Sequence, residues 1–356
     1  MSQLSAERPL HPVPVAVPEV GATQIPIALD HDTARSSGAR LGVACGLLSV
    51  LGYTLANVGL RRVAHWDPAW VSAMKAIPTL VIMALWLWRL GHRGVRLWPD
   101  RHGWRWLAVG SLAGQFGGNW AFQWSLGTVG LAYAVPLSTA SMILSGALLG
   151  RLFLHESLRP RSLLAMTLLI LAAVLLSVGV HQGTAPSSGT LTADTPAIGW
   201  GYGILGAAAA LLSGTAYAFL GVSIRRTVTQ QVPIATVMFV VAATGVLTMG
   251  SVGLLAQGPR ALVAIAATEY GWMLLAGLFT TGAFVCLTIA LRETSVTYVN
   301  SLSAAQVAAS SVLGHMLFGE PWTIWLLAGV LLTVLGLWLL PHGEPRPASA
   351  PQKAAF

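Results

Sequence analysis

The chain has 356 residues, of which 55% are hydrophobic and only 9% are charged. A water-soluble globular domain, which carries roughly 25% charged residues, is therefore excluded. The formal net charge of +8 does not indicate a nucleic-acid partner, because the positive residues lie in short segments between apolar stretches, where they set membrane orientation. The composition is typical of a polytopic membrane protein.

Residues 1–40 are rich in proline and polar side chains and lack the apolar core of a signal peptide, so we expect a disordered tail. Leu41–Leu60 follows as 20 residues without a charge. At a rise of about 1.5 Å per residue, this segment covers the ~30 Å of a bilayer's hydrocarbon layer. Nine similar stretches come after it. The predicted transmembrane helices are 41–60, 68–90, 105–126, 131–151, 161–180, 199–222, 234–256, 270–291, 296–317 and 322–340.

The positive residues predict the orientation of these helices. If the amino terminus is cytoplasmic, ten crossings return the carboxyl terminus to the same side, which then holds 16 of the 20 Lys and Arg residues. Only Arg61, Arg62 and Arg260 fall outside, and Lys75 falls within a helix. Because cytoplasmic loops carry the excess of positive charge, we expect a multi-pass protein of the inner cell membrane with both termini cytoplasmic.

The two halves of the chain repeat one another at a spacing of 164 residues, so that Tyr53 aligns with Tyr217 and Arg61 with Arg225. Each half contains five predicted helices, an odd number, so the second half begins on the opposite side of the membrane. The sequence therefore predicts an all-α fold of two inverted five-helix repeats. The expected domains are the tail at 1–40, the first repeat at 41–180, an external linker at 181–198, the second repeat at 199–340 and a cytoplasmic tail at 341–356.

A short turn that bears a glutamate precedes the last helix of each half. Glu156 lies in the segment LFLHESLRP and Glu320 in the segment LFGEPW, at equivalent positions of the duplication. These turns and the duplicated ten-helix pattern together resemble the paired EamA repeats of the drug/metabolite transporter superfamily. The resemblance implies ten helices, a central cavity between the halves, and transport of small metabolites, often as export.

Charged residues inside the predicted spans limit the mechanism. Lys75 lies seven residues beyond Pro68, hence ~10 Å along the second helix. Such a group attracts a substrate carboxylate or phosphate, and a lysine near a helix end also snorkels to water, so both interpretations stay open. All 12 acidic residues lie in tails, in loops or near predicted helix ends. Because proton-coupled carriers usually hold a carboxylate within the membrane, this pattern favours a facilitator or an exchanger.

Uncharged polar side chains recur at helical spacing on three predicted helices. Since a polar side chain that faces lipid is unfavourable, we expect these sides to face the bundle interior. Serines also fit ordinary packing between helices, whereas amides beside tryptophan are harder to explain in that way. With Lys75, the candidate cavity-lining residues are Gln115, Asn119, Trp120 and Gln123 on the third helix, Ser138 and Ser141 on the fourth, and Asn300, Ser303 and Gln306 on the ninth.

These features predict a permease that moves a small polar metabolite, by amino-acid or metabolite export, through alternating access of the two repeats. The alternative is an uptake carrier for sugars or other hydroxyl-rich solutes, since amides hydrogen-bond to hydroxyls. An intramembrane enzyme or a structural scaffold is a remote alternative, because the chain has no HExxH, GxSxG or CxxC motif. We therefore expect no catalytic residue, cofactor or metal; the expected partners are the solute and the lipid bilayer.

Overall fold

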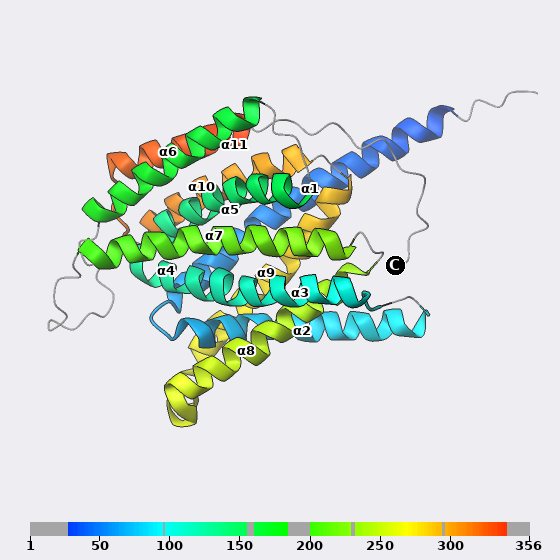
Figure 1. Cartoon of the computed structure of the whole chain (residues 1–356), viewed down its shortest axis with the longest axis horizontal. Helices are drawn as coiled ribbons and strands as arrows, with labels where there is room; N and C mark the ends of the chain where they lie inside the picture. Colours follow the sequence, from blue (N-terminus) through cyan, green and yellow to red (C-terminus); the bar gives the residue numbers. More distant parts are fainter. Residues whose placement is uncertain are drawn as a thin grey trace, which may run out of the picture.

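The structure is a computed structural model that describes residues 28–94, 97–154, 160–183, 200–228, 232–293 and 296–339. Within these ranges the secondary structure is helical and contains no strand, which confirms the all-α prediction. The helices, drawn in Figure 1, are α1 (Ala28–Arg62), α2 (Pro68–His92), α3 (Arg101–Ala113), η1 (Gly114–Trp120), α4 (Ala121–Val129), α5 (Leu131–Leu154), α6 (Pro160–Gly183), α7 (Trp200–Val228), α8 (Ile234–Val263), α9 (Ala267–Glu293), α10 (Val296–Phe318) and α11 (Ile324–Leu339).

Each predicted span has a helical counterpart, and two of them differ from the expectation. α1 begins at Ala28, so the last part of the segment expected to be a disordered tail is helical, while residues 1–27 lie outside the described ranges. The third span is divided into α3, the π-helical turn η1 and α4. The predicted start of α2 at Pro68 is confirmed: Asp67 caps the helix by accepting a hydrogen bond from the Trp70 amide at 2.9 Å.

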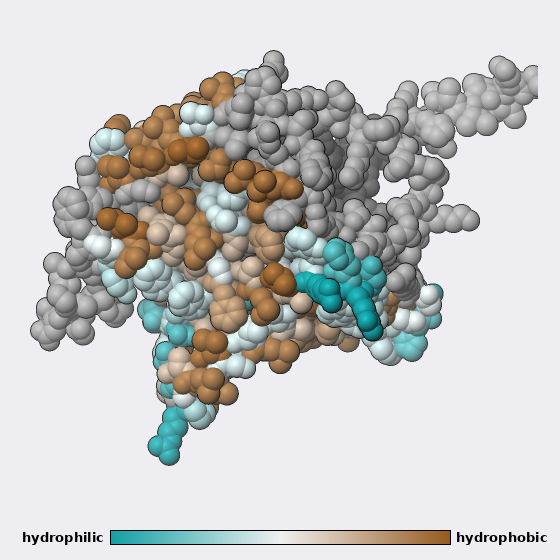
Figure 2. All heavy atoms as spheres, viewed as in Figure 1, coloured by the Kyte–Doolittle hydropathy of each residue, from teal (hydrophilic) through white to brown (hydrophobic). Residues whose placement is uncertain are grey.

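The outer surface of the bundle is apolar. Leu85 on α2, Leu247 on α8 and Leu331 on α11 are 59%, 70% and 62% exposed. Figure 2 shows hydrophobic residues across the described part of the face that it presents. Five described helices are long and apolar enough to cross a membrane, and shorter apolar helices accompany them. An apolar surface of this extent fits a bilayer and not water, so the chain is an integral membrane protein.

The main helix contacts join the first half of the chain to the second. α1 packs along α9, α2 along α8, α5 along α7 and α6 along α11. Small residues permit these close approaches: a Cβ at Gly52 of α1 would lie 2.9 Å from the Cβ of Ala283, and a Cβ at Gly214 of α7 would overlap the backbone of Ser138. The packing is unequal between the repeats. Among the described residues, α5 lies along much of α7, whereas its counterpart α10 contacts α1 less extensively.

Candidate functional site

A π-helical turn interrupts the third span between α3 and α4. Segments of this kind are rare and often occur at functional sites. The turn η1 contains glycines that let α7 approach: a Cβ at Gly117 would lie 2.8 Å from that of Ala216, and a Cβ at Gly118 would lie 2.8 Å from the ring of Tyr217. The same turn carries Gln115 and Asn119, so it places two amides at a crossing of helices.

These two amides belong to a chain of hydrogen bonds that connects three helical segments. The Tyr217 hydroxyl donates to Asn119 Oδ1 at 2.7 Å, Asn119 Nδ2 donates to Gln115 Oε1 at 2.8 Å, and Gln115 Nε2 donates to the Val241 carbonyl at 2.9 Å. Gln115 is fully buried and Asn119 is partly buried. This network therefore holds α7, η1 and α8 together, with Gln115 inside the bundle.

Lys75 lies close to this network along the bundle axis. α2 runs antiparallel to α8, with Trp70 against Gly253 and Ala73 against Gly250, while Gln115 lies against Gly245. Lys75 is therefore at nearly the same depth as Gln115, and α2 also contacts η1 directly. On the α9 side, a Cβ at Gly277 would overlap the Lys75 carbonyl, so the backbones of α2 and α9 touch at this level.

The Lys75 side chain is 8% exposed, and within the described ranges it forms no ion pair or hydrogen bond. Two neighbours on the same helix are polar: the Ser72 hydroxyl is buried with no partner among the described residues, and Thr79 hydrogen-bonds to Thr281 of α9 at 2.6 Å. A buried ammonium without a counter-charge is strongly unfavourable, by several kcal/mol. The arrangement is therefore suited to receive an anionic group.

Glu320 forms a second polar cluster, at the end of the bundle where α1 ends and α5 begins. The carboxylate is 4% exposed and accepts hydrogen bonds from the amides of Leu131 and Ala132 at 2.7 Å each. Arg61 donates from Nε to Glu320 Oε1 at 3.0 Å and from an η nitrogen to the Leu126 carbonyl at 2.7 Å. A carboxylate at a helix N-terminus satisfies free backbone amides and complements the helix dipole. Glu320 thereby ties the α10–α11 turn to the first repeat.

Gly130 makes the approach of this carboxylate possible. It has a φ of +83°, and a Cβ there would overlap the Glu320 carboxylate, so only glycine combines this backbone conformation with the contact. The duplication and the motif turn singled out Glu320 in the sequence, but not its partner. The sequence held one clue to that partner. Arg61 is among the few positive residues that the charge count places on the outer side, where a negatively charged partner would neutralise it.

Further contacts between the repeats gather at the same end of the molecule. Trp66 donates from its indole to Glu269 at 3.2 Å, Trp70 donates to the Tyr270 hydroxyl at 3.3 Å, and His65 approaches Glu269 at 3.8 Å. These contacts join the α1–α2 connection and the start of α2 to the start of α9. Together with the Glu320 cluster, they close this end of the bundle.

The remaining candidate residues have varied surroundings. Trp120 is 41% exposed and does not join the amide network, whereas Gln123 is buried and donates to the Leu60 carbonyl at 3.0 Å. Ser138 hydrogen-bonds to Ser213 at 2.8 Å and Ser141 to the Leu211 carbonyl at 2.6 Å, so both connect α5 to α7. Gln306 is partly buried on α10. The side chains of Asn300 and Ser303, and Glu156, lie outside what the structure describes.

Comparison with known families adds the decisive observation. The model of the EamA-like transporter family matches residues 40–178 and 204–340, which nearly coincide with the two repeats expected from the sequence. The chain belongs to the EamA-like transporter family. An EamA-like transporter is a membrane permease with two copies of one helical repeat, and this agrees with the contacts between the halves.

A solved structure titled only "Crystal structure of protein" has the same fold, with a TM-score of 0.54. The match covers 84% of this chain and 96% of that chain at 20% identity, so it extends to the fold alone. No curated protein matches the sequence. Within the described residues, no group of three His, Cys, Asp or Glu side chains gathers to hold a metal ion.

Proposed function

We propose that this EamA-like transporter exports a small polar metabolite that carries an anionic group, of the amino-acid class, by alternating access. The observation that carries the proposal is Lys75, a nearly buried ammonium without a partner in the described part of the chain. A solute carboxylate would supply the missing counter-charge. The amides near η1, at the same depth, offer hydrogen bonds to the rest of the solute when their own chain opens.

In the proposed orientation, the protein lies in the inner cell membrane and both termini are in the cytoplasm. Arg61 and Glu320 then lie at the outer end, and their ion pair joins the two repeats on that side. Support comes from the distribution of positive residues, and also from the ion pair itself, because a paired Arg61 adds no net charge to the outer side. A permease closed on the outer side exchanges solute with the cytoplasm in this conformation, and we propose that the solute bound there is then released outside.

We also propose facilitated movement or exchange, without proton coupling. Among the described residues Glu320 is the buried acidic side chain, and its oxygens are already occupied by Arg61 and the α5 amides. This leaves the central region near Lys75 without a carboxylate relay in the described ranges. Sugar uptake remains the second candidate, since the amide network suits hydroxyl-rich solutes.

The test is counterflow into proteoliposomes that contain the purified protein and pooled amino acids or sugars, with and without a pH gradient. We expect amino-acid counterflow that Lys75→Ala lowers about tenfold or more and that Lys75→Arg partly retains, since the buried charge is lost in the first variant alone. Arg260→Ala, an exposed basic residue far along α8, is the matched control. Movement of sugars alone would contradict the proposed solute class, and unchanged flux in Lys75→Ala would contradict the role of Lys75. Strict dependence on a proton gradient would contradict transport without proton coupling.

A further inference from the structure

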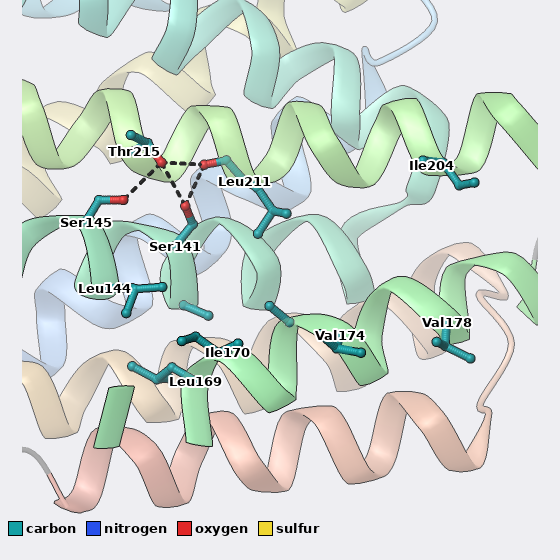
Figure 3. A pocket seen from close by; sticks show the side chains of 12 residues that line it. Ser141, Leu144, Ser145, Leu169, Ile170, Val174, Val178, Ile204, Leu211 and Thr215 are labelled. Carbon is teal, nitrogen blue, oxygen red and sulfur yellow. Dashed lines mark hydrogen bonds between the residues drawn. The ribbon is translucent and has the colours of Figure 1, made fainter. Parts of the chain in front are cut away.

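A groove between α5, α6 and α7 lies apart from Lys75 and the amide network. It has a volume of about 670 Å³, and Figure 3 shows its walls. α6 contributes aliphatic side chains that include Ile170, Val174 and Val178, and α7 contributes Ile204. Val174 and Ile204 are 52% and 59% exposed, so the groove opens sideways from the bundle. It arises because α6 packs on α11 and α5 and hardly touches α7.

The few polar groups of the groove are already satisfied. Thr215 hydrogen-bonds to Ser141 and Ser145 at 3.0 Å each and donates to the Leu211 carbonyl at 3.1 Å, and Ser141 also reaches that carbonyl. These bonds are the dashed lines of Figure 3. A ligand in the groove therefore meets aliphatic carbon and hydroxyls that need no partner. This chemistry does not favour a polar solute, so the groove is not a continuation of the solute site.

The shape and position of the groove identify an occupant. On α7 the groove extends from Ile204 to Thr215, eleven residue steps or ~16 Å along the helix axis. It is parallel to a candidate membrane span, Gly201–Ile224. It begins near the N-terminus of α7, on the side of the bundle where α1 ends. Water does not fill apolar space at this depth, and an empty groove would forfeit dispersion contacts along its length. A flexible hydrocarbon chain parallel to the helices meets all of these conditions.

We propose that this groove binds one acyl chain of a membrane phospholipid, from the leaflet on the Arg61 side. The chain lies against α6 on one side and α7 on the other, and its end reaches the hydroxyls of Ser145 and Thr215. It fills the space that separates the α6–α11 pair from α7. A chain in this groove differs from the other lipids around the protein because three helices enclose it. The proposal does not depend on the solute proposed above.

Native mass spectrometry of the full chain, purified from cell membranes in a mild detergent, tests this proposal. We expect about one phospholipid per chain to survive detergent exchange, and Val174→Trp or Ile170→Trp, which fill the groove, to lower its retention about tenfold. Leu171→Trp is the matched control, because Leu171 is on the same helix and 46% exposed but does not line the groove. The absence of retained lipid in the unmodified protein would overturn the proposal, as would equal loss in all three variants. A dimer that only the groove variants dissociate would assign the groove to a second copy of the chain instead.

A phospholipid with a photoreactive group midway along its acyl chain provides a test that needs no variant. After irradiation in native membranes, we expect the adducts to concentrate on peptides from α5, α6 and α7. An even distribution over the exposed faces of all the described helices would show that the groove holds no lipid of its own.

Discussion

Replacement of Glu320 by glutamine tests the closure of the bundle at the Arg61 end. The substitution keeps the shape of the side chain but removes its charge. The glutamine oxygen can still accept a hydrogen bond from one of the two α5 amides. Its NH2 group then faces the other amide or Arg61, and because both of these groups are donors, no hydrogen bond forms there. Arg61, whose side chain is only 16% exposed, loses its counter-charge. Because breaking one partner of a buried pair costs about 3–5 kcal/mol, we expect Glu320→Gln to lower the free energy of unfolding by about that amount.

The assay is reversible unfolding by SDS titration in lipid–detergent micelles, followed by circular dichroism. Glu269→Gln is the matched control, since Glu269 meets the exposed His65 at 3.8 Å and such a pair contributes roughly 0–1 kcal/mol. The Arg61→Gln/Glu320→Gln double variant should lose about 1–3 kcal/mol less than the sum of the single losses, as coupled residues do. If Glu320→Gln and Glu269→Gln destabilise equally, the inference that Glu320 fastens the two repeats together is wrong.

Three further outcomes follow from the packing and the orientation. Tyr217→Phe removes the donor to Asn119 and should destabilise the protein by about 1 kcal/mol in the same unfolding assay, and an unchanged stability would contradict the chain of hydrogen bonds. Gly214→Ala forces α7 away from the α5 backbone and should cost about 1–3 kcal/mol, while Gly221→Ala, which meets nothing within 4 Å, should be neutral or slightly stabilising. In a background without native cysteines, an impermeant maleimide should label Gln257→Cys in intact cells and Arg101→Cys only after permeabilisation. The reverse pattern would invert the proposed orientation.

The membrane spans could be predicted from the sequence because their signals are local. Apolar runs of sufficient length, the Asp67–Pro68 helix start and the 164-residue register each depend on residues near one another or on simple repetition. The structure and the family match confirm the resulting all-helical, two-repeat architecture. The early start of α1 was missed, because polar residues before Leu41 carry no hydropathy signal.

The site was less predictable, because its partners are distant in the sequence. Helical spacing brought Gln115 and Asn119 together correctly, but their hydrogen bond to Tyr217 depends on how α7 crosses η1. Trp120, on the same π-helical turn, is 41% exposed and takes no part in that network, so its role as a cavity-lining residue stays a prediction. The contact of Glu320 with Leu131 spans 189 residues, and no local pattern specifies such a pair.

The unequal packing of the two repeats has an energetic consequence for transport. An inverted pair changes access when its halves exchange conformations, so α5 would part from α7 while α10 takes up the equivalent place along α1. The α5–α7 contact holds hydrogen bonds of Ser138, Ser141 and Ser145 to α7, but the equivalent positions of α10 are Leu302, Ala305 and Ala309. At about 0.6 kcal/mol for each membrane hydrogen bond, these three favour the present conformation roughly twentyfold. These three hydroxyl groups therefore stabilise the α5–α7 contact, and any conformation in which α5 parted from α7 would have to offset their loss.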